Sequence, residues 1–181
     1  TTNAVIFGIL VGSRRGPDME VIPRREMPPL LHHDMDAPAL WNVRKKQYLY
    51  CDGHAPVSHR VLMQFILLPS NDAETVRGWE DEFEDILAWI RALEPPKYPW
   101  PIDEGLAARG ERVFNRACSR CHGTHGPEGH YPEKNIPIDV VGTDPLRHHA
   151  LTQVHREWLR QSWMARDAEA PVLLHPPGYV A

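Results

Sequence analysis

The chain has 181 residues, enough for one domain with its own core or for two small ones. Its composition, with 42% apolar and 24% charged residues, is ordinary for a globular protein, but 18 prolines indicate long irregular segments. A formal net charge of −4 gives nucleic-acid binding no electrostatic support, and the longest apolar runs are too short to cross a bilayer. We therefore expect no nucleic-acid partner and no membrane-spanning segment.

The N-terminal half is expected to be irregular. Two short apolar runs, residues 5–11 and 61–68, are separated by a long stretch without a regular pattern, residues 16–59. Cys51 lies in this stretch, and a buried, small apolar residue is the expected role for it, ahead of a reactive or bridging one.

The clearest predicted helix covers residues 72–93. Its apolar residues recur at steps of three and four, and its acidic residues face the other way. Asn71 or Asp72 is the expected N-cap, and the Pro95-Pro96 pair prevents continuation. Residues 95–101 should form an extended connector, which divides the chain into an N-terminal segment, 1–94, and a second domain, 95–181.

Two further helices are predicted in the second domain. One is capped by Asp103 and runs through Phe114 towards Cys118, and the other covers residues 151–164. Residues 122–147, which are rich in glycine and proline, are expected to form a loop. The predicted fold class is mostly α, with an irregular, proline-rich N-terminal half.

The run Cys118-Ser119-Arg120-Cys121-His122 is the pattern that carries chemistry. Two thiols three positions apart on a helical turn can each form a thioether with a haem vinyl group, and the adjacent His122 can ligate the iron. A chain of this composition would contain the pattern by chance only about 0.003 times. The sequence therefore predicts one covalent haem c, bound by Cys118, Cys121 and His122.

Two other kinds of site could use these cysteines. A thioredoxin-like redox pair would follow a buried strand, and the preceding segment is a helix start instead. A zinc site could combine Cys51 and His54 with Cys118 and Cys121, but it leaves the adjacent His122 unexplained.

The second axial ligand of the iron is less well defined. Met164 is the only methionine after the haem motif, and it lies where a predicted helix gives way to a loop, so we predict it as the ligand. The alternatives are the downstream histidines, His130, His148, His149, His155 and His175. The loop around Pro127, Pro132 or Pro137 could supply a backbone carbonyl to the other ring nitrogen of His122.

Residues 110–123 resemble the first helix and haem motif of class I cytochromes c. That resemblance implies that Gly110 and Phe114 pack against an aromatic residue of the last helix, here Trp158. Residues 90–146 more specifically resemble the second haem domain of dihaem proteins related to rubber oxygenases and bacterial dihaem cytochrome c peroxidases.

The dihaem resemblance implies a second haem motif, whereas this chain contains one. We therefore expect either a fragment of a dihaem protein, with further chain before Thr1 and after Ala181, or a single-haem relative. In the fragment interpretation, His32 and His33 would lie near another, catalytic haem; otherwise they are surface residues of a proline-rich loop.

Three functions are compatible with these features. The first is electron transfer as a carrier or relay; the second is part of a dihaem peroxidase- or oxygenase-like enzyme; the third is a structural, haem-bearing subunit of a larger redox complex. The expected partner is a redox protein or a second haem domain. Because haem c is attached after export, we expect a periplasmic or otherwise extracytoplasmic location and a leader or larger precursor before Thr1.

Overall fold

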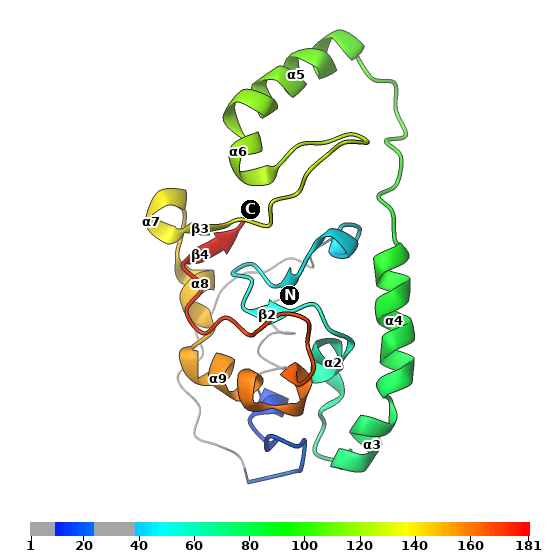
Figure 1. Cartoon of the computed structure of the whole chain (residues 1–181), viewed down its shortest axis with the longest axis vertical. Helices are drawn as coiled ribbons and strands as arrows, with labels where there is room; N and C mark the ends of the chain where they lie inside the picture. Colours follow the sequence, from blue (N-terminus) through cyan, green and yellow to red (C-terminus); the bar gives the residue numbers. More distant parts are fainter. Residues whose placement is uncertain (1–9, 24–38) are drawn as a thin grey trace.

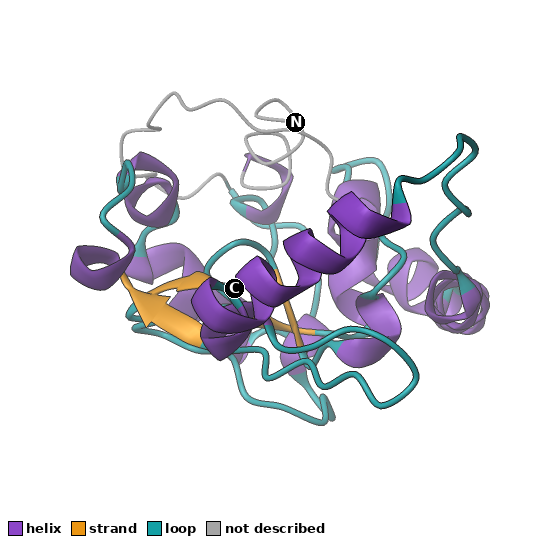
Figure 2. Ribbon diagram, turned by 90° about the horizontal axis from the view of Figure 1, so that it is seen from above, coloured by secondary structure: helices purple, strands orange, loops and turns teal. Residues whose placement is uncertain are grey.

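We describe the protein from a computed structural model, which describes residues 10–23 and 39–181. The fold is mixed and mostly helical, with short two-stranded sheets (Figures 1 and 2), as expected from the sequence. The α-helices are α2 (His59–Leu62), α3 (Ala73–Gly78), α4 (Glu80–Ala92), α5 (Glu104–Ala117), α6 (Ser119–His122), α7 (Ile138–Val141), α8 (Leu146–Ala150) and α9 (Gln153–Gln161). The 3-10 helices are η1 (Val43–Lys45), η2 (Met63–Ile66) and η3 (Trp163–Ala165), and the strands are β1 (Tyr48–Leu49), β2 (Ala55–Pro56), β3 (Asn135–Pro137) and β4 (Gly178–Val180).

The helix predicted at residues 72–93 is present but is interrupted at Trp79. Asp72 is the N-cap of α3, because its Oδ1 accepts a hydrogen bond of 2.8 Å from the backbone N–H of Thr75. Trp79, with φ −94° and ψ 15°, separates α3 from α4. Leu93 is already extended, with ψ 139°, and the prolines that follow it stop the helix as expected.

The other two predicted helices differ in how well they match. Asp103 caps α5 as expected, since its Oδ1 accepts a hydrogen bond of 2.9 Å from the backbone N–H of Leu106. The helix predicted at 151–164 is shorter, because the extended backbone of Ser162, with ψ 159°, separates α9 from η3. The expected loop at 122–147 contains β3, α7 and the start of α8.

The main core joins residues from both sides of the boundary that we expected at residue 94. Its buried residues are Val11, Met19, Ala55, Val61, Met63, Leu67 and Val76 from the N-terminal side, and Trp158, Leu159, Trp163, Met164 and Val172 from the C-terminal side. The indole Nε1 of Trp158 also donates a hydrogen bond of 3.0 Å to the backbone carbonyl of Arg15. Residues 146–181 thus pack against the N-terminal segment (Figure 1).

The two short sheets connect segments that are far apart in the chain. Strand β1 pairs antiparallel with β2, with Leu49 opposite Ala55, and β3 pairs antiparallel with β4, with Ile136 opposite Tyr179. The β3–β4 pair holds the C-terminal strand, β4, beside β3, which lies at the end of the loop that follows the haem motif. The core and the sheets therefore leave residues 94–132 as the part that extends from the body. This part is tied back to the body at Glu133, whose carboxylate accepts hydrogen bonds from the backbone N–H groups of Gln47 (2.7 Å) and Tyr48 (2.9 Å).

We call residues 104–134, which contain α5, α6 and the loop after them, the α5–α6 arm. Figure 1 places α5 and α6 at one end of the molecule and α9, α2 and α3 at the other. No residue between Ile90 and Gly123 is buried. Leu106 and Val113 of α5 are 59% and 52% exposed, so the protein does not cover the apolar residues of this helix.

Candidate functional site

The two cysteines of the haem motif lie one helical turn apart at the end of α5. Cys118 is the C-cap of α5, and α6 carries Cys121 and His122. The backbone N–H groups of Cys121 and His122 both donate hydrogen bonds of 3.0 Å to the carbonyl oxygen of Cys118. Both thiols are half-buried and free of a disulfide, and His122 is exposed. The structure therefore brings the three predicted haem-binding residues together on one short helical segment.

Gly123 turns the chain sharply after His122. Its φ is 75°, and a Cβ at this position would lie 1.9 Å from the backbone oxygen of His130 and 2.7 Å from the ring of Pro132. The backbone N–H of Thr124 donates a hydrogen bond of 2.9 Å to the same His130 oxygen. In return, the backbone N–H of His130 donates a hydrogen bond of 3.1 Å to Thr124 Oγ1. The loop therefore returns past the motif, and of the three prolines expected near His122, Pro132 lies next to this turn.

The surface near the motif is hollowed, with a lining of both polar and apolar residues. An open hollow of about 470 Å³ lies between α5 and the following loop, lined by Glu104, Ala107, Ala108, Glu111, Phe114, Asn115, Thr124 and His125. The Phe114 ring lies 4.8 Å from the His125 ring, measured between centroids. The two free thiols lie one helical turn apart with an imidazole at the next position, which is the donor set that haem c needs. The residues present fit a covalent haem c.

The packing implied by the class I cytochrome resemblance is not found in the described residues. Nothing lies within 4 Å of a Cβ built on Gly110, so Trp158 does not pack there. The Trp158 ring lies instead 3.2 Å from a Cβ built on Gly12, in the main core. Trp158 lies there and not against α5 because α9 packs against the N-terminal segment.

Met164 is placed away from the haem motif. It belongs to η3, is 1% exposed, and is part of the main core together with Trp158 and Trp163. In Figure 1, α6 lies in the upper half of the molecule, whereas α9 and the segment that follows it lie in the lower half. The structure does not bring Met164 and His122 together.

The candidate histidines occupy different environments. His130 lies in the arm beside Gly123, and His175 is an exposed residue. His148 and His149 are neighbours on α8, with ring centroids 5.4 Å apart. His155 is half-buried beside Trp158, and desolvation, assisted by the electrostatic effects of His54 and Arg156, lowers its pKa to about 4. His32 and His33 lie outside the described residues.

The alternative zinc ligands are not gathered into a site. His54 is buried, and its Nδ1 lies 2.7 Å from Asp52 Oδ1. Burial raises the pKa of the Cys51 thiol, which disfavours the thiolate that zinc binds. Within residues 10–23 and 39–181, the side chains that lie close enough together to share a metal ion include none of these four residues. Cys51 and His54 therefore do not converge with Cys118 and Cys121.

The structure also contains a buried charge cluster that sequence reasoning missed. Asp52 is 3% exposed, and its Oδ2 accepts a hydrogen bond of 2.8 Å from the guanidinium of Arg156. Burial disfavours ionisation of Asp52, but the hydrogen bonds and charges of His54 and Arg156 outweigh it and lower its pKa to about 2. These residues are 104 positions apart, so no local pattern could have paired them. The cluster links the N-terminal segment to α9.

Comparisons with known proteins identify no relative. No protein-family model matches the sequence, and no curated protein or solved structure is significantly similar to it. Among the described residues, no helix is both long enough and apolar enough to span a membrane.

Proposed function

We propose that this chain is a c-type cytochrome, with one haem held covalently by Cys118 and Cys121 and with His122 as an axial ligand. The observation that carries the proposal is the position of the two free thiols, one turn apart at the end of an exposed amphipathic helix. Each thiol adds across one vinyl group: a carbon–sulfur bond forms, and the thiol proton passes to the other vinyl carbon. Attachment in this way needs no oxidant.

Electron transfer is the function that this arrangement supports best. Haem, when bound, supplies a one-electron iron couple whose potential depends on the axial ligands and on burial. The α5–α6 arm extends from the body, so a group at Cys118 and Cys121 would remain accessible to a redox partner protein or to a second haem domain. We propose that the chain acts as a carrier or relay in an extracytoplasmic compartment, where haem c is attached.

A second candidate function is a role within a dihaem peroxidase- or oxygenase-like enzyme. The observation in its favour is the apolar surface that leads into the arm, where Tyr98 is 65% and Trp100 66% exposed. Large exposed aromatic residues are typical of surfaces that contact another domain or protein. Carbon monoxide distinguishes the two functions: rapid binding to the reduced protein indicates an open iron site suited to catalysis, and no binding indicates a six-coordinate relay.

The test compares haem attachment in cysteine variants after export in a host that attaches haem c. Wild-type protein should keep haem in a denaturing gel, whereas the Cys118→Ser, Cys121→Ser double variant should lose all covalent haem. Cys51→Ser is the matched control, because Cys51 is also a half-buried free thiol but lies outside the motif, and this variant should retain haem. A folded wild-type protein without haem would refute the proposal.

A further inference from the structure

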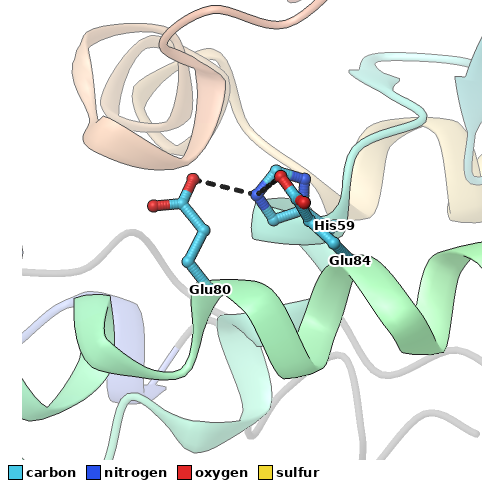
Figure 3. Close-up of side chains that lie close together, drawn as sticks. All are labelled: His59, Glu80 and Glu84. Carbon is cyan, nitrogen blue, oxygen red and sulfur yellow. Dashed lines mark hydrogen bonds and ion pairs between the residues drawn. The ribbon is translucent and has the colours of Figure 1, made fainter.

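A second potential ligand site lies on the body of the protein, between α2 and α4. His59 is the first residue of α2, and Glu80 and Glu84 lie one turn apart on α4. The three side chains point towards one another from these two helices (Figure 3). His59 Nε2 lies 3.0 Å from Glu80 Oε1 and 3.8 Å from Glu84 Oε1, and the three ligand atoms all lie within 4.8 Å of one another.

These separations are close to those around a bound transition-metal ion. With metal–ligand bonds of about 2.0–2.2 Å and tetrahedral angles, neighbouring ligand atoms lie about 3.2–3.6 Å apart. The two distances from His59 Nε2 fall on either side of this range. The side chain of Glu84 is 61% exposed, so a small rotation can move its carboxylate oxygen by a few tenths of an ångström at little cost. One ion could therefore bind all three residues without a change in the backbone.

The neighbouring Arg60 restricts how Glu80 could take part. Its guanidinium donates a hydrogen bond of 2.5 Å to Glu80 Oε1 and is held over the Trp163 ring, 4.6 Å from the centroid. Because this is the same oxygen that lies 3.0 Å from His59 Nε2, the Glu80 carboxylate would have to rotate to ligate an ion through Oε2 while Arg60 keeps Oε1. Fixing a ligating carboxylate through its second oxygen is a common function of residues around metal sites.

We propose that His59, Glu80 and Glu84 form a binding site for a divalent transition-metal ion of the zinc type. One imidazole and two carboxylates favour such an ion over calcium or magnesium, which prefer sets made of oxygen ligands alone. Three protein ligands leave a fourth position for water. The ion would join α2 to α4, and because only the folded chain gathers these residues, its binding would stabilise the fold.

The test is calorimetric titration with zinc chloride at pH 7.5, on the full chain treated with iodoacetamide so that free thiols do not bind zinc. The Glu84→Gln variant removes a ligand at an exposed position, so it should fold normally. Glu82→Gln, which changes an exposed carboxylate on the same helix outside the cluster, is the matched control. We expect zinc to bind the wild type and Glu82→Gln alike, and to bind Glu84→Gln at least about 10-fold more weakly.

Thermal unfolding provides a second readout. Zinc should raise the melting temperature of the wild type and of Glu82→Gln, and it should raise that of Glu84→Gln much less. Zinc affinity or stabilisation that is equal in Glu84→Gln and in the wild type would overturn the proposal. Absence of zinc binding to the wild type would overturn it as well.

Discussion

The substitution Met164→Ala separates two roles for this residue, because a core residue and an iron ligand respond differently to it. Met164 is 1% exposed and lies in the main core. Alanine removes three heavy atoms beyond Cβ, which corresponds to a transfer free energy of about 2.4 kcal/mol at about 0.8 kcal/mol for each. The cavity left behind increases the loss, and we expect about 3–4 kcal/mol in total, within the usual range for such changes.

The assay is urea unfolding followed by far-ultraviolet circular dichroism, with the absorption spectrum of the oxidised protein recorded in parallel. A loss of about 3–4 kcal/mol is a large part of the 5–15 kcal/mol that holds a typical domain folded. It should therefore move the urea midpoint strongly without changing the slope of the transition. Met164→Leu is the control, because it preserves volume and should cost less than about 1.5 kcal/mol.

The spectrum decides between the two roles. If Met164 is only a core residue, neither substitution alters the haem absorption. If it ligates the iron, as its position in the sequence suggests, the oxidised wild type shows a weak sulfur-to-iron band in the far red, and both substitutions abolish it. A loss below about 1 kcal/mol combined with disappearance of that band would refute the core placement.

Two further predictions concern the turn after the haem motif and the half-buried His155. Gly123→Ala should sharply reduce the yield of haem-loaded protein, measured by haem staining, because a Cβ at this position would clash with the His130 backbone. Gly110→Ala is the control: its position is open, so this substitution should leave the yield unchanged. The free energy of unfolding of the wild type should fall by about 3 kcal/mol as the pH drops from about 6.5 to about 4. The reason is that His155 of the unfolded chain takes up a proton that the half-buried ring of the folded protein, with its pKa of about 4, resists. His155→Gln should lose most of this pH dependence in urea unfolding, and an unchanged dependence would contradict the neutral state of the half-buried ring.

Local features of the sequence were sufficient to predict several elements. The caps Asp72 and Asp103 and the stop before Pro95 depend on groups only a few residues away, and all three are present in the structure. The placement of Cys118 and Cys121 on one turn is equally local, because three-residue spacing on a helix determines it. The sequence alone thus determined the arrangement on which the proposed haem attachment depends.

Other features were decided only by packing between distant segments. Whether Met164 lies beside the haem motif or in the core depends on how residues 146–181 dock on the N-terminal segment, and the pairing of Asp52 with Arg156 depends on the same docking. The gathering of His59 with Glu80 and Glu84 similarly requires α2 to lie against α4. Such contacts result from burying apolar surface across the whole chain, which leaves no periodic pattern near the residues that it brings together.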